Sequence, residues 1–409
     1  MKDFKQFIPC LLLVFLIQAG CNPSSENNDA KDKDTTAITV VAAEKDGAVF
    51  TANPQPVPEQ PVPTLEIGSK APDFNLPGVD GKYHSLNEYS VADVLVIIFS
   101  CNHCPTAQAY EDRMIALSND YKDKGVQVVV ISPNSPLSLL YDELGYSDLG
   151  DTYDEMIIRA RDKNYNFPYL YDGDTHTASM KYGPVATPHA YVFDKERILR
   201  YLGRLDASEK PGSANAEDLR AAIDAMLEGR EVKNAQTKTF GCSVKWAWKD
   251  EWKKKIYADW DATPVTIEEI DEAGIAELLS NDTENLRLIN VWATWCGPCL
   301  IEYPEFIEMQ RMYGQRSFEF ISISADNPDA KDKALKALQK KHSAVKNYIF
   351  SKEDKYALIE AVDPDWNGAL PYTVLIEPGG NRIYSKQSTI DPLELRRLIV
   401  DHELIGRYY

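Results

Sequence analysis

The sequence lacks an apolar run long enough to cross a membrane as a helix, and it is poor in basic residues. Its most extended apolar run, Phe7–Ile17, is far shorter than the about 20 residues that a transmembrane helix needs. Its 44 Lys and Arg residues are outnumbered by 63 Asp and Glu residues, giving a net charge of −19. Such a charge repels phosphate backbones, so we expect no nucleic-acid partner.

Histidine is also scarce, with 6 residues in the chain. Apart from His103 they stand singly, at His84, His176, His189, His342 and His402. This scatter has no metal-ligand spacing, so we predict no metal and no cofactor beyond redox-active disulfides. His189 follows Pro188 directly and is expected near the reactive cysteines described below.

Residues 1–20 have the pattern of a targeting segment. Lys2 and Lys5 precede the apolar run, and Ala19 and Gly20 lie directly before Cys21. Small residues before a cysteine resemble the bacterial lipobox, in which the cysteine is lipidated, although Gln18 departs from the usual aliphatic residue. The alternative is plain secretion with Cys21 as a spare cysteine. We predict a signal peptide over 1–20, a lipid on Cys21, and a location in the periplasm or cell envelope, anchored to a membrane.

The rest of the chain divides by composition into a tether and two similar units. Residues 21–63 are polar and then proline-rich, which predicts a disordered tether. We place one domain at 64–245, a helical connector at 246–262 and a second domain at 263–409. In the connector, Trp248, Trp252, Ile256 and Trp260 recur every four residues, so one face is expected to pack onto a domain.

Both units have the same order of predicted strands, helices and motifs, which indicates an internal repeat. Each has an apolar strand that runs into a C-x-x-C pair, then a helix and a second apolar strand, predicted at 94–100, 105–122 and 126–131 and at 286–292, 299–313 and 318–324. This pattern predicts a parallel βαβ unit in an α/β fold. Near the end of each unit a proline, Pro188 or Pro371, directly precedes a predicted strand, and a final helix follows at 217–227 or 393–405. We expect the fold to bring each proline back to its cysteines.

The strongest motif is Trp295-Cys296-Gly297-Pro298-Cys299. A cysteine where a strand feeds a helix is stabilised as a thiolate by the helix N-terminus. Cys296 would attack a disulfide, and Cys299 would then release the product. A structural zinc site needs two further ligands, and no second Cys or His pair follows at a suitable spacing.

The second pair is Cys101-Asn102-His103-Cys104-Pro105, in the same strand-to-helix setting. A protonated His103 would stabilise the Cys101 thiolate and make this disulfide more oxidising. The alternative is a copper site on Cys101, His103 and Cys104, because Cu(I) prefers soft ligands.

Residues 286–324 and 366–384 resemble the TlpA/ResA-like branch of the thioredoxin superfamily, on the signature LRLINVWATWCGPCLIEYPEF. The resemblance implies that Pro371 is a cis-proline that packs against the disulfide and pairs with substrate backbone. It also implies that Glu302 lies near the active site and affects thiol protonation. The alternative is an exposed glutamate in the first helical turn.

Residues 71–248 resemble the peroxiredoxin-like (AhpC/TSA, redoxin) branch, on APDFNLPGVDGKYHSL, IFSCNHCPTAQAYEDRM, KYGPVATPHAYVFD and GCSVKW. Together the two resemblances imply two thioredoxin-like folds in tandem, each with a central mixed sheet flanked by helices. They also place the cis-proline of the first unit at Thr187-Pro188. The Pro and Thr that ordinarily precede a peroxidatic cysteine are missing before Cys101, so the resemblance does not establish a peroxidase.

Cys242 stands apart from both pairs, in Gly241-Cys242-Ser243. It could act as a third, resolving thiol or as an inert structural one.

The sequence therefore predicts an exported thiol–disulfide oxidoreductase with two redox-active pairs. Its expected partners are thiols or disulfides of exported proteins and a membrane electron donor. One alternative is an antioxidant peroxidase in which Cys101 attacks a hydroperoxide and Cys104 or Cys242 resolves it. The other is a copper-handling protein.

Overall fold

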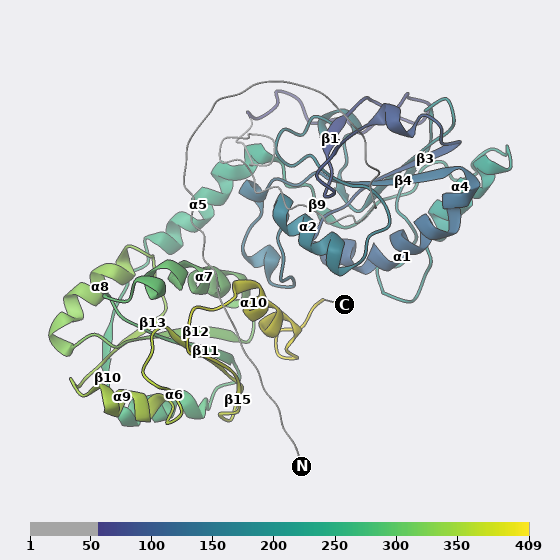
Figure 1. Ribbon diagram of the computed structural model, residues 1–409. Helices are drawn as coiled ribbons and strands as arrows, with labels where there is room; N and C mark the ends of the chain where they lie inside the picture. Colours follow the sequence, from purple (N-terminus) through teal and green to yellow (C-terminus); the bar gives the residue numbers. More distant parts are fainter. Residues whose placement is uncertain (1–55, 409) are drawn as a thin grey trace, which may run out of the picture. The chain divides into compact units, whose positions relative to one another are not determined.

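The computed structural model describes residues 56–408, which contain two central β-sheets (Figure 1). The first sheet consists of β3 (Val94–Phe99), β4 (Val126–Ser132), β5 (Tyr169–Tyr171), β7 (His189–Phe193) and β8 (Leu199–Gly203). The second consists of β10 (Glu268–Ile270), β11 (Leu286–Trp292), β12 (Phe318–Ser324), β13 (Lys346–Phe350), β14 (Tyr372–Ile376) and β15 (Arg382–Lys386). The signal peptide, the Cys21 anchor and most of the tether lie outside the described residues.

The two sheets have the same topology. The strand orders are β5-β4-β3-β7-β8 and β13-β12-β11-β14-β15, with β10 added beside β13. In each sheet the central strand, β3 or β11, runs parallel to one neighbour and antiparallel to the other. The predicted α/β class, the mixed sheets and the tandem repeat of a thioredoxin-like fold are confirmed.

Two further strand pairs lie outside these sheets: β1 (Asn75–Pro77) with β2 (Tyr83–Ser85), and β6 (Ala186–Thr187) with β9 (Cys242–Ser243). The helices are α1 (Pro105–Tyr121), α2 (Tyr153–Asp162), α3 (Ser179–Tyr182), α4 (Glu217–Leu227), α5 (Asp250–Asp261), α6 (Glu272–Ser280), α7 (Gly297–Tyr313), α8 (Lys331–Gln339), α9 (Lys355–Val362) and α10 (Pro392–Asp401). None of the helices within 56–408 is long and apolar enough to cross a membrane.

Strand β3 shows why the central strands are continuously apolar. Its alternate residues Val94, Val96 and Ile98 belong to a core that includes side chains of α1, α2 and α4. The other set, Leu95, Ile97 and Phe99, belongs to a second core on the opposite face of the sheet. Successive strand residues point to opposite faces, so a strand covered on both faces must be apolar at every position. In the second sheet, α7 lies on one face and α6 and α9 on the other (Figure 1).

The sheet register brings each proline to the end of the central strand. Phe99 pairs with His189, and Val291 pairs with Tyr372, so Pro188 and Pro371 lie beside the residues that lead into the cysteine pairs. The Thr187–Pro188 and Leu370–Pro371 peptide bonds are both cis, as the resemblances implied.

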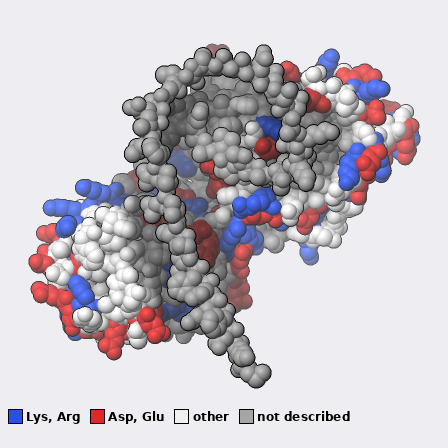
Figure 2. Space-filling view, viewed as in Figure 1, with Lys and Arg blue, Asp and Glu red and all other residues white. Residues whose placement is uncertain are grey.

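The surface carries charges of both signs. Figure 2 shows Lys and Arg beside Asp and Glu over the face in view.

Helix α5 lies in the segment predicted as a connector, but its Trp252 and Ile256 are exposed. The predicted packing of this face is therefore wrong at these two positions.

Candidate active site

The second cysteine pair lies at the start of α7. Cys296 is the N-cap of this helix, and its Sγ accepts a hydrogen bond from the Cys299 backbone N–H at 3.3 Å. The two sulfurs form a disulfide in this structure. Cys296 is 6% exposed and Cys299 is 0% exposed. Cys296 is therefore the more accessible of the two cysteines.

Two large apolar side chains close to this cysteine pair in the sequence are exposed. Trp295 is 66% exposed and Ile301 is 80% exposed, and Gly297 and Pro298 between the cysteines are also exposed. Exposed apolar groups beside a reactive sulfur favour the docking of another polypeptide.

Glu302 is buried one helical turn after Cys299, so the alternative of an exposed glutamate is wrong. Its Oε2 accepts a hydrogen bond from the Ile390 backbone N–H at 2.9 Å, and its Oε1 contacts the Asn290 amide at 3.5 Å. Burial raises the pKa of this carboxyl group to about 7, against the opposing effect of the two hydrogen bonds. Glu302 can therefore exchange a proton near neutral pH.

We predict that Glu302→Gln slows the step in which Cys299 releases a mixed disulfide by about a hundredfold, because a positioned proton acceptor is lost. In the wild type, release should accelerate as the pH rises through about 7 and Glu302 loses its proton. Stopped-flow measurement of release from pH 5 to 9 checks both effects. Glu305→Gln, in the same helix, is the control, and an inflection near pH 7 that survives in Glu302→Gln would contradict the assignment.

The first cysteine pair differs from the second in where its helix begins. Pro105 is the first residue of α1, so the N-cap is Cys104 and not Cys101. Our prediction that the leading cysteine of each pair lies at the helix N-terminus is therefore wrong for this pair. The physical reason is Pro105: its fixed φ and missing N–H favour the first position of a helix.

Both sulfurs of this pair are buried against Thr187. Cys101 Sγ lies 3.1 Å from Thr187 Oγ1, and Cys104 Sγ donates to the Thr187 carbonyl at 3.4 Å. Cys101 is 3% exposed and Cys104 is 0% exposed. The predicted return of the proline strand to the cysteines is confirmed here by direct contact.

The two sulfurs have opposite electrostatic surroundings. Burial alone would raise the pKa of Cys104, but hydrogen bonds from Cys101 and Cys242, the charge of His103 and the Ala107 N–H outweigh it and lower that pKa well below its usual value. Burial, together with the neighbouring Cys104 and Asp151, raises the pKa of Cys101 well above its usual value. Of the two thiols in the reduced pair, Cys104 is therefore the more acidic.

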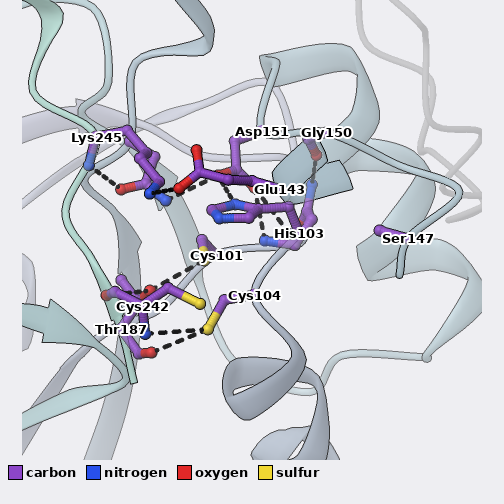
Figure 3. A network of polar contacts seen from close by, with 12 residues as sticks. Cys101, His103, Cys104, Glu143, Ser147, Gly150, Asp151, Thr187, Cys242 and Lys245 are labelled. Atoms are coloured by element: carbon purple, nitrogen blue, oxygen red, sulfur yellow. Dashed lines mark hydrogen bonds and ion pairs between the residues drawn. The ribbon is translucent and has the colours of Figure 1, made fainter. Parts of the chain in front are cut away.

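A buried carboxylate, Asp151, holds the segment between the two cysteines (Figure 3). Its Oδ1 accepts from the backbone N–H groups of Asn102 (2.9 Å) and His103 (3.1 Å). Its Oδ2 lies 2.5 Å from His103 Nδ1 and accepts from the Asn134 amide at 2.8 Å. Burial opposes charge on both partners, yet the pKa of His103 is raised by Asp151 and the pKa of Asp151 is lowered by His103. Asp151 and His103 thus form a buried ion pair.

Ligand-type atoms of Cys101, His103 and Asp151 all lie within 4.8 Å of one another. This grouping differs from the predicted copper set, because Asp151 takes the place of Cys104. Asp151 already holds His103 Nδ1, and its hard oxygen is a poor match for Cu(I). The cluster accordingly fits a charge pair better than a copper site. His189 is also buried, and its hydrogen bonds within 56–408 go to Val185 and Tyr191.

Cys242 lies beside the first pair. Its backbone N–H donates to Cys104 Sγ at 3.4 Å, and its residue is half-buried. Strand β9 pairs Cys242 with Thr187. The sequence left open whether Cys242 is a resolving or a structural thiol and did not predict its contact with Cys104. It also missed the role of Asp151, because no local motif links this residue to the C-x-x-C pair.

Comparisons with known proteins identify the family of the chain and several similar proteins. The AhpC/TSA family model matches residues 67–202 and 267–384, one region in each repeat. The thiol–disulfide oxidoreductase ResA of Oceanobacillus iheyensis is 28% identical over 156 residues, which cover 34% of this chain and 71% of the relative. A solved structure of an uncharacterized conserved protein from Geobacillus kaustophilus is 37% identical with a TM-score of 0.40 and covers 44% of this chain and 92% of its own. A solved hypothetical protein from Sinorhizobium meliloti is 30% identical with a TM-score of 0.40, covering 45% of this chain and 96% of its own.

Proposed function

The chain belongs to the AhpC/TSA family and is an oxidoreductase, and from this premise we propose that it is an exported thiol–disulfide oxidoreductase. Its two centres are Cys296/Cys299 and Cys101/Cys104, and its substrates are disulfides or thiols of envelope proteins. A membrane protein supplies its electrons. The signal-type segment 1–20 and Cys21 support export and attachment to a membrane by a lipid.

The observation that carries this proposal is the position of Cys296 at the start of α7. The helix N-terminus and the Cys299 N–H stabilise a thiolate on Cys296 once the pair is reduced. That thiolate attacks a substrate disulfide, so a mixed disulfide forms and one substrate sulfur leaves. Cys299 then attacks Cys296 Sγ, which releases the reduced substrate and leaves the module oxidised.

Peroxidase activity at Cys101 is the alternative that the family match favours. In that reaction Cys101 would attack a hydroperoxide. The surroundings of Cys101 argue against it, because burial raises the pKa of this thiol and so disfavours the thiolate, which is the better nucleophile. Peroxide consumption that disappears in Cys101→Ser would nevertheless establish the alternative.

The test is capture of substrates in the cell that makes the protein. In Cys299→Ser, the mixed disulfide on Cys296 cannot be resolved, so envelope proteins should accumulate covalently on the variant. Acid quenching, alkylation and mass spectrometry identify them. The double variant Cys296→Ser, Cys299→Ser is the control and should capture none through this module. Equal capture by both variants would contradict the proposal.

A further inference from the structure

A short segment of the chain covers the first cysteine pair. Strand β9 pairs antiparallel with β6, so that Cys242 lies opposite Thr187 and Ser243 opposite Ala186. Thr187 is the residue that contacts both sulfurs of the pair. We call residues 239–245 the strap.

The strap is held on both sides of Cys242. Before it, Thr239 Oγ1 donates to the Pro188 carbonyl at 2.9 Å. After it, the Lys245 N–H donates to Asn134 Oδ1 at 2.9 Å, and Asn134 also binds Asp151. The strap is thus connected to the same polar network that holds His103 (Figure 3).

Gly241 allows the strap to lie this close. Its φ is +136°, and a Cβ at this position would lie 2.1 Å from the Thr187 carbonyl oxygen. Any other residue would have to push the strap away from β6. The sequence therefore provides for direct contact between Cys242 and the pair.

The sulfur of Cys242, which belongs to the strap, lies with the two sulfurs of the first pair. The three cysteines differ in their exposure to solvent. Cys101 and Cys104 form a buried cluster with Ala107, and Cys242 packs against it. Of the three, only Cys242 is partly exposed to solvent. A hydrogen bond to Cys104 and burial raise the pKa of Cys242 in the reduced protein. The charge of Cys104 also raises the pKa of Cys242. When Cys104 is in a disulfide it carries no charge, so this contribution to the pKa of Cys242 is lost.

The second module has no such cover. Within 56–408, β14 pairs only with β11 and β15, and no strand pairs with the residue before Pro371. Trp295, next to Cys296 in the sequence, and Ile301, two residues after Cys299, are exposed. The two modules thus share a fold but differ in access to their sulfurs.

We propose that Cys242 is the exit thiol of the first module, through which the buried pair exchanges its disulfide with an outside thiol. This rests on the proposed thiol–disulfide exchange and adds a third sulfur to it. The Cys242 thiolate attacks Cys104 Sγ of the Cys101–Cys104 disulfide. The Cys104–Cys242 bond forms, the Cys101–Cys104 bond breaks, and Cys101 leaves as a thiolate that takes up the proton given up by Cys242.

This internal exchange needs no added oxidant or reductant, because one disulfide replaces another. An outside thiolate then attacks Cys242 Sγ, so a mixed disulfide forms on Cys242 and Cys104 leaves as its thiolate. A second outside thiol attacks this mixed disulfide, releases Cys242 as a thiol and carries the disulfide away. A tethered thiol acts at an effective concentration of about millimolar or more, so it should outpace an outside thiol at about 0.1 mM by about tenfold.

The first test uses the full chain with Cys101→Ser. Under mild oxidation by oxidised glutathione, peptide mapping should find Cys104 joined to Cys242. In the control, Cys242→Ser and Ser243→Cys together move the thiol by one strand position, to the opposite side of β9, and the link should disappear. A Cys104 that stays free or becomes glutathionylated while Cys242 stays unmodified would overturn the proposal.

The second test follows reduction of the Cys101–Cys104 disulfide by glutathione at about 0.1 mM. Cys242→Ser should slow it by about tenfold, with the Cys296–Cys299 disulfide as an internal control of unchanged rate. Gly241→Ala should also lose the Cys104–Cys242 link, whereas Gly229→Ala, at a positive φ with open space around it, should keep it. If Cys242→Ser reduces the Cys101–Cys104 disulfide at an undiminished rate, the role of Cys242 as exit thiol is refuted and the proposed function is unaffected. If the first pair can be neither reduced nor oxidised, its role in the proposed function is refuted.

Discussion

Replacement of Cys296 by serine is expected to abolish disulfide reduction by the second module. A serine hydroxyl is not ionised where the cysteine thiolate would be, so the attacking nucleophile is lost. We expect the rate of insulin reduction to fall by about a thousandfold or more, as when a nucleophile is removed from other enzymes. The measurement is best made in a Cys101→Ser, Cys104→Ser background, in which only the second pair can turn over.

Cys299→Ser is the matched control for this loss. It keeps the attacking sulfur, so it should form one mixed disulfide with substrate and then stop. Cys104→Ser alone should leave second-module activity intact. Undiminished insulin reduction in Cys296→Ser would remove the proposed role of this cysteine.

Asp151→Ala should destabilise the first module by about 3–5 kcal/mol, because it leaves a buried imidazolium and two backbone N–H groups without their partner. All four contacts of Asp151 lie in the segment around the first pair or on Asn134. Since the chain has two modules, a single unfolding transition would mix them. Hydrogen exchange of β3 and β7 peptides at increasing denaturant gives the stability of the first module by itself.

Asp154→Ala is the control, because Asp154 is exposed in α2, and it should change stability by less than about 0.5 kcal/mol. Exchange from β11 should stay unchanged in both variants. The folded pKa of Asp151 is depressed, so its contribution is present above the unfolded value of about 3.9 and is lost as the pH falls through the folded value. The difference in the stability of the first module between wild type and Asp151→Ala should therefore become smaller at acidic pH. An equal effect of both substitutions would contradict the buried ion pair.

The central strands and helices could be predicted because their signals are local. The strands predicted at 286–292 and 318–324 are β11 and β12 with the same bounds, and the helix predicted at 217–227 is α4. A strand buried on both faces must be apolar throughout, and a helix must carry a periodic face, so each leaves a pattern in neighbouring residues. The two cis-prolines followed from family motifs in the same way.

The features that sequence reasoning missed depend on contacts between distant segments. Asp151 is one of many acidic residues, and only the folded loop places it under His103. The pairing of Cys242 with Thr187 uses a strand of two residues, too short to leave a periodic signal. The shift of the helix start to Pro105 could have been anticipated, because proline favours the first helical position. The exposure of Trp252 shows that a four-residue apolar spacing does not by itself establish packing.

The proposed function requires two reactive dithiol pairs in different surroundings. The most direct test is a redox titration of the full chain against glutathione, with acid quenching and mass spectrometry that resolves each cysteine peptide. Both pairs should titrate as two-electron couples. The Cys101/Cys104 couple should be the more oxidising by about 30 mV or more, equivalent to about 1.4 kcal/mol, because the surroundings that lower the pKa of Cys104 stabilise the reduced form. A pair that stays in one redox state across the whole range, or two equal potentials, would refute the proposed pair of distinct redox centres.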